Sequence, residues 1–354
     1  MPVNIQPQDL PVLLLHNVDP AWPPDDRRRA TGATEQLESA LADVGHPVTS
    51  LPVFDADIAS VLSPYHPDDA IVFNWCEELP GVLHSEALVA EHIEGLNFVY
   101  TGSGPETLAQ CADKLGVKHL LREAGIPTPS YHFFESPKRN AWRHFPAIVK
   151  PSLEHCSIGI TPESVVMTEE ELLRRVEYVI DRYDQPALVE DFIDGREFRV
   201  SIWGNSQLVV LPPVEMDFSA FEDVRDRLCT YDAKFVPESV HYRKIETILP
   251  AALTEAERRR LERVSRLTYR ALGCRDYARM DIRLRNGIFF VLDVNPNADI
   301  SFDASMAFAA EEAGYSYGAM GSYIARLAAR RHAVFAPRRR RRRTETLAAM
   351  TAAE

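Results

Sequence analysis

Cysteine is scarce in this chain, and no cysteine spacing marks a bound metal or a disulfide framework. The 354 residues contain five cysteines, which are widely scattered and never form a C-x-x-C pair. An odd, scattered set argues against both a disulfide-stapled scaffold and a zinc site. We therefore expect a protein of a reducing compartment, the cytoplasm.

Long apolar runs and a targeting segment are also missing. Residues 1–10 show no basic region followed by an apolar one. No apolar run approaches the roughly 20 residues that a membrane-spanning helix needs. The sequence thus predicts a soluble chain without a membrane partner.

Positive charge is in deficit. Lys and Arg number 39 against 52 Asp and Glu, for a net charge of −13, and six of the arginines form the run Arg338–Arg343. Such an acidic body argues against general binding of nucleic acid. We expect residues 333–354, which contain this run, to be a solvated, disordered tail, with binding of an anionic partner as the alternative. With 45% hydrophobic residues, the chain is long enough for two or three domains.

The chain is organised around residues 279–297, which have the pattern of a β-hairpin. Apolar residues fill the even-numbered positions of both arms. The odd positions include Arg279, Asp281, Asp293 and Asn295. This period-two alternation predicts one core face and one polar face. We expect a three-residue loop at 285–287, because a two-residue loop would put the two aspartates on opposite faces.

The polar face of this hairpin has the composition of a magnesium site. Asp281, Asp293 and Asn295 offer two carboxylates and an amide oxygen. These are hard ligands, which leave room for water and substrate phosphates. Arg279 lies on the same face, where a guanidinium beside a cation can hold a phosphorylated intermediate. The alternative is an acid-rich hairpin that faces solvent.

Strands and helices alternate in the first hundred residues. Short apolar runs at 11–16, 70–75 and 97–100 predict buried parallel strands. Helices are expected between them, at 33–44 and 83–93. The alternation indicates an N-terminal α/β domain that ends soon after the third strand.

Lysines occupy three positions in the region that follows. A capping box at Ser103 predicts one helix, and 113–124 predicts a second, on which Lys114 and Lys118 share a face. For both lysines the alternative is a solvated side chain. Lys150 ends the next apolar strand and leads into a loop of small residues, where an ammonium and backbone N–H groups can meet a phosphate. This loop is not a G-x-x-x-x-G-K-[ST] sequence.

Two further strands, at 187–193 and 196–204, form an edge that could hold an adenine and a ribose. Phe192 and two carboxylates, one of them Glu197, lie along this edge. Residues 217–248 are polar and aperiodic, which is typical of a functional lid or of disorder. The remaining expected elements are a strand at 207–215, helices at 168–183 and 254–272, and an amphipathic helical region at 304–330.

Taken together, these motifs resemble the ATP-grasp superfamily, and within it the D-alanine–D-alanine ligase-like group, over residues 97–329. The motifs occur in one order: Asp113-Lys114 with Gly125-Ile126-Pro127, Val149-Lys150-Pro151 with Ser157-Ile158-Gly159, Leu188 to Ile193 with Gly195-Arg196-Glu197, Tyr231 to Lys234, and the hairpin. The implied fold is α/β (α+β). It has an N-terminal Rossmann-like pre-ATP-grasp domain at 1–102, a central ATP-grasp lobe at 103–193 and a C-terminal lobe at 194–332.

The resemblance also implies roles for single residues. The phosphate lysines would be Lys114, Lys150 and Lys234. Adenine would be held by Glu190, Phe192 and Ile193, and the ribose by Glu197. The metal ligands would be Asp281, Asp293 and Asn295. The catalytic residues would be Arg279, Lys234 and Ser157. The implied cofactors are ATP and Mg²⁺, with Mn²⁺ as an alternative metal.

The implied reaction joins a carboxylate to an amine. ATP phosphorylates the acid, the amine attacks the acyl phosphate, and ADP and phosphate leave. We expect small-molecule carboxylate and amine substrates, and a homodimer is compatible with the sequence. A carboxylate kinase of the same fold and a non-catalytic nucleotide-binding protein are the alternatives.

The departures from the family pattern concern the substrate. Asp293 stands where the family has a glutamate, and His155-Cys156-Ser157 replaces its Gly-Ser-Ser. The N-terminal domain lacks the Glu-containing Val-Ser-Leu motif that the family uses for the first D-alanine. These departures predict a product other than D-Ala-D-Ala. Whether His155 or Cys156 handles substrate stays open.

Overall fold

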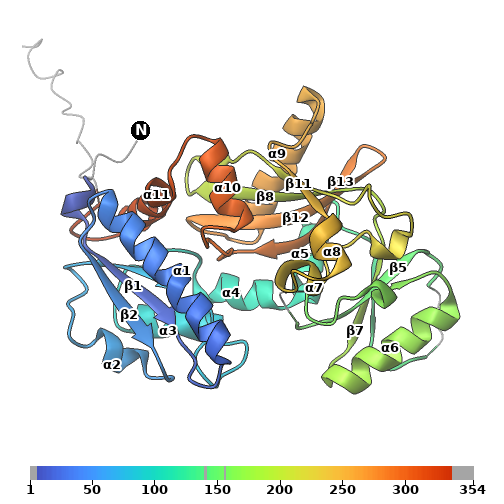
Figure 1. Ribbon diagram of the computed structural model, residues 1–354, viewed down its shortest axis with the longest axis horizontal. Coiled ribbons are helices and arrows are strands. Elements are labelled where there is room, and N and C mark those ends of the chain that lie inside the picture. The colour runs from blue at the N-terminus through green and yellow to red at the C-terminus, as the bar shows by residue number, and fades with distance from the viewer. Residues whose placement is uncertain (1–5, 139–141, 155–156, 337–354) are drawn as a thin grey trace, which may run out of the picture.

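The computed structural model describes residues 6–138, 142–154 and 157–336, and within them the chain forms three β-sheets (Figure 1). In Figure 1 a parallel sheet lies at the lower left, a four-stranded sheet at the lower right, and a six-stranded sheet across the top. His155, Cys156 and the run Arg338–Arg343 lie outside the described residues. Across the described ranges, no helix combines the length and apolar character that crossing a membrane requires.

The N-terminal sheet has the parallel order β2-β1-β3. Its elements are the 3-10 turn η1 (Pro7–Asp9), β1 (Val12–Asn17), α1 (Pro24–Asp43), β2 (Val48–Val53), α2 (Ile58–Leu62), β3 (Ile71–Trp75) and α3 (Glu86–Gly95). All of β1 is buried, because α1 packs on one face of the sheet and α2 and α3 on the other. The expected strand at 97–100 forms only one bridge, from Tyr100 to Val72.

Two helices lead from this sheet to the centre of the molecule, α4 (Pro105–Ala112) and α5 (Lys114–Glu123) (Figure 1). The expected capping box at Ser103 is wrong, because Gly104 is the N-cap of α4 and provides no side chain. The Ser103 hydroxyl instead accepts a hydrogen bond from the N–H of Arg275 at 3.1 Å. Asp113 caps α5 by accepting from the N–H of Leu115 at 2.9 Å.

The central sheet is antiparallel, in the order β4-β7-β5-β6. Its elements are β4 (Tyr131–Phe134), β5 (Ala147–Pro151), η2 (Pro162–Ser164), β6 (Val165–Val166), α6 (Glu169–Tyr183) and β7 (Ala187–Asp191). Leu172, Val176 and Val179 form the buried stripe of α6, which packs on β5 and β7. Thr168 caps this helix as expected, by accepting from the N–H of Glu171.

The C-terminal sheet has the order β11-β10-β8-β12-β13, with β9 paired to β8. Its strands are β8 (Arg196–Gly204), β9 (Leu208–Val210), β10 (Val214–Asp217), β11 (Glu246–Ile248), β12 (Tyr277–Arg285) and β13 (Ile288–Asn295). Its helical elements are η3 (Val224–Asp226), α7 (Asp232–Phe235), α8 (Val240–Lys244), α9 (Glu255–Ala271), α10 (Ser305–Glu312) and α11 (Tyr317–Ala329). The single strand expected at 207–215 is two strands, and the helical region expected at 304–330 contains two helices.

The hairpin of β12 and β13 corrects the expected turn. Arg285 pairs with Ile288, so the loop has two residues, Asn286 and Gly287, whose φ angles are 53° and 76°. Both angles suit the Asn-Gly turn that is favoured in tight hairpins. A bulge then shifts the register beyond Ile282, and Asp281 faces Asp293.

The bulge also changes which hairpin residues form the core. Phe289 and Val291 are buried, whereas Ile288 is 47% exposed. The apolar face expected at even-numbered positions is therefore wrong for the outer half of β13. The face shared by the two aspartates is correct, but it depends on the bulge and not on the loop length.

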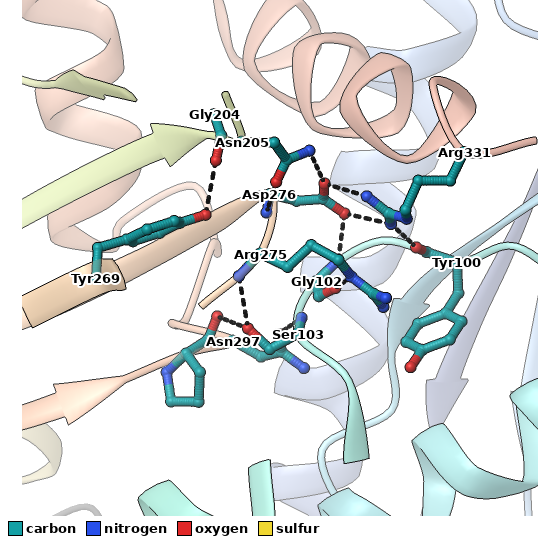
Figure 2. A network of polar contacts seen from close by, with 11 residues as sticks. Tyr100, Gly102, Ser103, Gly204, Asn205, Tyr269, Arg275, Asp276, Asn297 and Arg331 are labelled. Atoms are coloured by element: carbon teal, nitrogen blue, oxygen red, sulfur yellow. Dashed lines mark hydrogen bonds and ion pairs between the residues drawn. The ribbon is translucent and has the colours of Figure 1, made fainter. Parts of the chain in front are cut away.

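A buried carboxylate, Asp276, joins the end of the N-terminal sheet to the C-terminal part of the chain near the start of β12 (Figure 2). It accepts hydrogen bonds from the N–H of Gly102 at 3.0 Å and from Nδ2 of Asn205 at 2.9 Å. Arg331 forms an ion pair with it at 2.6 Å and also donates to the carbonyl of Tyr100 at 2.7 Å. The end of the N-terminal sheet is thereby fixed beside the hairpin.

Candidate active site

A cavity of about 130 Å³ lies between the four-stranded and six-stranded sheets. Its walls come from β5 and β7 on one side and from β8, β12 and β13 on the other, with α5 and α7 contributing one side chain or more each. Every predicted site residue except Arg279 and Asn295 lines it, namely Lys114, Lys150, Ser157, Glu190, Phe192, Ile193, Glu197, Lys234, Asp281 and Asp293.

Glu190 of β7 binds two lysine ammonium groups at once. Lys118 Nζ lies 2.7 Å from one carboxylate oxygen, and Lys150 Nζ lies 2.6 Å from the other. Burial opposes the charge of Glu190, but the two ammonium groups outweigh it and lower the pKa of this carboxyl to about 2. The expected contact of Glu190 with adenine stays a prediction, because a carboxylate that accepts from two lysines still has free lone pairs.

Lys114 occupies the same end of the cavity. Its ammonium donates to the carbonyl oxygen of Glu154, at the start of the small-residue loop. Burial lowers the pKa of Lys114, and Lys150 adds to this effect while Asp293 opposes it. Two lysines that repel one another in a half-closed site are arranged to receive an anion.

The two hairpin aspartates face each other as register partners across β12 and β13. Arg279 Nε lies 2.9 Å from Oδ1 of Asp281. Burial opposes ionisation of Asp281, but Arg279 and Arg199 outweigh it and lower the pKa of this carboxyl below its usual value. Asp281 is therefore an anion at neutral pH, and its charge is available to a cation.

Asn295 pairs with Arg279 in the same ladder, and its Nδ2 atom is buried without a hydrogen-bond partner among the described residues. Such an orphaned amide indicates a ligand at this position, or an amide turned so that its oxygen lies there. Within the described ranges, no three His, Cys, Asp or Glu side chains gather as a metal site. A cation between Asp281 and Asp293 would complete its shell with water and phosphate oxygens, which is the habit of Mg²⁺. The residues present fit that ion.

Ser157 and Lys234 come from two loops that meet over the cavity. Ser157 has a φ of 64°, and its hydroxyl donates to the carbonyl of Cys229 at 3.0 Å. This bond ties the small-residue loop to the polar stretch 217–248, which also carries Lys234 on α7. Lys234 helps to lower the pKa of Asp281. The structure thus brings both residues to the cavity.

Phe192, Ile193 and Glu197 also line the cavity. Their exposed fractions are 3%, 1% and 7%. Glu197 forms an ion pair with Arg283 of β12, in which Nε lies 2.7 Å from Oε2. The carboxylate expected to meet a ribose is therefore already fixed by a cation.

The comparison with known proteins agrees with this geometry. A family model described as D-Ala D-Ala ligase C-terminus matches residues 120–324, which is more than half of the chain. The chain belongs to the D-alanine–D-alanine ligase family of ATP-grasp proteins.

Relatives of this family match most of the chain. An uncharacterised protein of Sinorhizobium fredii is 33% identical over 310 residues, which cover 84% of this chain and 88% of that protein. A D-alanine–D-alanine ligase of Carboxydothermus hydrogenoformans is 30% identical over 290 residues, which cover 78% and 86%. The crystal structure of the D-alanine–D-alanine ligase from Bacillus anthracis complexed with ATP superposes with a TM-score of 0.70, at 20% identity, over 91% of this chain and 98% of that chain. The expected ATP-grasp fold is thereby confirmed.

Sequence reasoning about this ATP-grasp chain misses two cations of the cavity. Lys118, for which a solvated side chain was the alternative, is 1% exposed and also donates to the carbonyl of Leu292 at 2.8 Å. Arg199 is the register partner of Asp281 on β8 and lines the cavity. Burial opposes its charge, while the Cys229 thiol and Asp281 raise its pKa. Alternation along β8 could have indicated Arg199, since it shares a strand face with Glu197.

Proposed function

We propose that this chain is an ATP- and Mg²⁺-dependent carboxylate–amine ligase, which forms an amide bond through an acyl phosphate and releases ADP and phosphate. Family membership supports ATP-dependent ligation in general. The finer assignment rests on one observation: Asp281 and Asp293 oppose each other beside the Arg279 guanidinium, at the end of the cavity where the lysines converge. This arrangement suits a phosphoryl group that is transferred between two oxygens.

The residues divide the work of phosphoryl transfer between them. Asp281, Asp293 and the Asn295 amide would hold Mg²⁺, which neutralises phosphate charge when bound. Lys114 and Lys150 would bind phosphate oxygens of ATP, and each offers an ammonium in a partly dry site. The contact between Ser157 and Cys229, which joins the small-residue loop to the lid stretch, would help to keep water out.

The proposed reaction has two steps. A carboxylate oxygen of the acid attacks the γ-phosphorus of ATP, and the bond from that phosphorus to the ADP oxygen breaks. An uncharged amine then attacks the acyl carbon, phosphate leaves with the electron pair of the broken bond, and the amine loses a proton. Arg279 would hold the acyl phosphate through both steps, since a guanidinium can donate two parallel hydrogen bonds to it.

We also propose that the substrates are not two D-alanine molecules, because this chain lacks the family motif for the first of them and has Asp293 in place of glutamate.

A hydroxylamine screen tests the proposal without knowledge of the amine. Candidate acids, D-alanine among them, are incubated with the protein, ATP, Mg²⁺ and hydroxylamine. Hydroxylamine converts an acyl phosphate to a hydroxamate, which is detected because it forms a coloured complex. The expected result is hydroxamate and ADP with a narrow group of acids, and no product with Asp293→Asn. Acids that succeed are then paired with amines, and phosphate release should require both.

The same screen separates the alternatives. ADP formation with an acid alone, at full rate and with a stable acyl phosphate as product, would identify a carboxylate kinase. Bound ATP without turnover for any acid would identify a nucleotide-binding protein. D-Ala-D-Ala formation at a rate above all other pairs would contradict the proposed substrate difference.

A further inference from the structure

Arg283 is a buried cation that the proposed chemistry does not use. It lies on β12, two residues beyond Asp281, and only 3% of it is exposed. Glu197 of β8 is its register partner on the neighbouring strand. Both side chains line the cavity. A buried arginine at a ligand site needs a set of partners, and those partners show what it does.

The guanidinium of Arg283 holds three separate segments of the chain. Its Nε donates to Oε2 of Glu197 at 2.7 Å, and its Nη1 donates to the carbonyl of Ile193 at 2.9 Å. Its Nη2 donates to the carbonyl of Arg227, in the polar stretch 217–248. One side chain thus links β8, the connection between the two lobes, and the base of the lid.

Two aromatic rings fix the plane of this guanidinium. The Arg283 Cζ atom lies 4.7 Å from the ring centre of Phe192 and 5.3 Å from that of Phe218. Rings at these distances attract a cation and restrict its rotation. The direction in which Arg283 presents its N–H groups is therefore set by packing before any nucleotide binds.

Arg227 reinforces the link between the lid and the lobe connection. Its guanidinium lies 3.2 Å from the carboxylate of Asp194 and donates to the carbonyl of Phe221 at 3.1 Å. The backbone of Arg227 is held by Arg283, and its side chain is held by the turn that precedes β8. The first part of the lid stretch is thus anchored at the nucleoside end of the cavity.

Glu197 keeps acceptor capacity for a ligand. A carboxylate can accept about four hydrogen bonds, and Arg283 Nε takes one of the positions on Oε2. The group lies beside Phe192 and Ile193 on the cavity wall. The two hydroxyls of a ribose are donors at the spacing of two carboxylate oxygens, so an oriented carboxylate can bind both of them.

We propose that Arg283 is a positioning residue for the nucleotide, which orients Glu197 toward the ribose hydroxyls and so makes the protein discriminate ATP from 2′-deoxy-ATP. The proposal rests on the proposed function, in which ATP is the nucleotide, and on the ribose position at Glu197 that the family resemblance implies. It adds a residue that does not contact the reacting atoms but determines the selectivity of the protein for ribose over 2′-deoxyribose. Because Arg283 acts on the nucleotide through Glu197, its replacement should change nucleotide selectivity only while Glu197 is present.

The test measures dissociation constants of ATP and 2′-deoxy-ATP with Mg²⁺ by calorimetry, in the absence of acid and amine. The wild-type protein is expected to prefer ATP by roughly 10- to 100-fold, the effect of one charge-assisted hydrogen bond. In Arg283→Met the preference should fall to roughly threefold or less. Arg283→Lys keeps a cation for Glu197 but loses the fork, and it should retain an intermediate preference.

Arg196 provides a matched control. It also pairs with a carboxylate, that of Glu215 at 2.6 Å, also donates to a carbonyl, that of Ala252 at 2.7 Å, and also lies over a ring, that of Phe198 at 5.0 Å. It does not line the cavity. Arg196→Met should leave the ATP preference unchanged, even where its melting temperature falls.

A double mutant shows whether Arg283 acts through Glu197. Glu197→Gln should lose the ATP preference, and the double variant Arg283→Met/Glu197→Gln should lose no more than Glu197→Gln alone. A folded Arg283→Met with the wild-type preference, or additive losses in the double variant, would overturn the proposal. Where the methionine variant does not fold, Arg283→Gln, which keeps a donor but no charge, gives the same decision.

The outcome is separable from that of the proposed function. A protein that prefers ATP through Arg283 but forms no hydroxamate with any acid retains this inference and loses the ligase assignment. A protein that ligates but binds the two nucleotides equally retains the ligase assignment and loses this inference. Wild-type protein that binds neither nucleotide overturns both.

Discussion

The two ends of the cavity differ in how completely their polar groups are paired. Around Arg283, where we propose that the nucleoside binds (the nucleoside end), the guanidinium has a carboxylate and two carbonyls as partners and lies between two rings. Around Asp281, where we propose that the phosphates and the metal bind (the phosphate end), Arg279, Arg199 and Lys234 all act on this carboxylate, and the Asn295 amide nitrogen has no hydrogen-bond partner among the described residues. One end is complete before a ligand arrives, whereas the other carries unbalanced charge that a polyanion and a metal ion would complete.

This difference assigns different duties to the two ends. A preorganised end loses little entropy on binding and can discriminate ligands by their shape, in this case by the sugar of the nucleotide. An end with excess cations gains most from a ligand whose charge grows during the reaction. Mutations at the phosphate end should therefore change turnover, and mutations at the nucleoside end should change which nucleotide binds.

The largest effect should come from removing the metal carboxylates. Asp281→Asn and Asp293→Asn keep the size of each side chain but remove one charge from the proposed Mg²⁺ shell, so turnover should fall by roughly a thousandfold or more. Steady-state phosphate release measures it. Asp184→Asn is the control, because Asp184 is exposed and its left-handed φ of 51° is tolerated by asparagine. Near-normal turnover of both cavity variants would refute the metal assignment.

Removal of the carboxylate that binds two lysines should affect stability most. Glu190→Gln leaves Lys118 and Lys150 in a buried site without their counter-charge, which costs about 3–5 kcal/mol for a broken buried pair. Chemical denaturation at pH 7 measures it. The difference should shrink with acid. The folded-state pKa of Glu190, about 2, lies below its ordinary value of 4.5, so its stabilisation is present above that value and is lost as the pH falls toward 2.

A constant difference between Glu190→Gln and wild type from pH 7 to pH 3 would contradict this reading of the lysine pair. Glu163→Gln is a suitable companion, because Glu163 also has a lowered pKa but has no lysine partner among its causes. Its effect on stability should be small at every pH, since Glu163 is exposed in the short turn η2, whose N-cap is Thr161.

The Arg279 guanidinium should matter for chemistry more than for binding. Arg279→Lys keeps the charge near Asp281 but loses the two parallel donors, so single-turnover phosphoryl transfer should slow by roughly 10²–10³-fold. ATP affinity should change far less. Rapid-quench measurement with saturating ATP gives the rate, and thermal melting shows whether the fold is intact. A variant with a lower melting temperature but a normal single-turnover rate would make Arg279 a structural residue.

Local sequence rules predict most of the fold and the metal face, because each element carries its own signal. Thr168 and Thr254 cap their helices as the capping pattern requires. The hairpin shows a limit of such rules. The Asn286-Gly287 pair favours a two-residue turn, and a bulge at Leu292 restores the facing aspartates, so two local features compensate each other. The alternation of apolar and polar residues over the whole hairpin cannot distinguish a three-residue loop from a two-residue turn followed by a bulge.

The charged pairs inside the cavity are beyond sequence reasoning for a different reason. Lys118 meets Glu190 across 72 residues of chain, and Arg283 meets Glu197 across two strands that are adjacent only in the folded sheet. From the local sequence alone, each of these residues could equally be a solvated surface side chain. Burial distinguishes the paired state from the solvated one, and burial results from the packing of the lobes.

The smallest effect, and the sharpest test of the comparison, concerns a lysine of the lid. Lys234 lines the phosphate end, whereas Lys244, ten residues further on, is exposed. Lys234→Ala removes one charge-assisted contact to a phosphate, which is about 1.5–3 kcal/mol, so ATP affinity should fall roughly 10- to 100-fold. Adenosine affinity should not change, because adenosine has no phosphate. Lys244→Ala should alter neither, and Arg283→Met should weaken adenosine and ATP alike. Equal losses of adenosine and ATP affinity in Lys234→Ala would show that the two ends of the cavity are not independent.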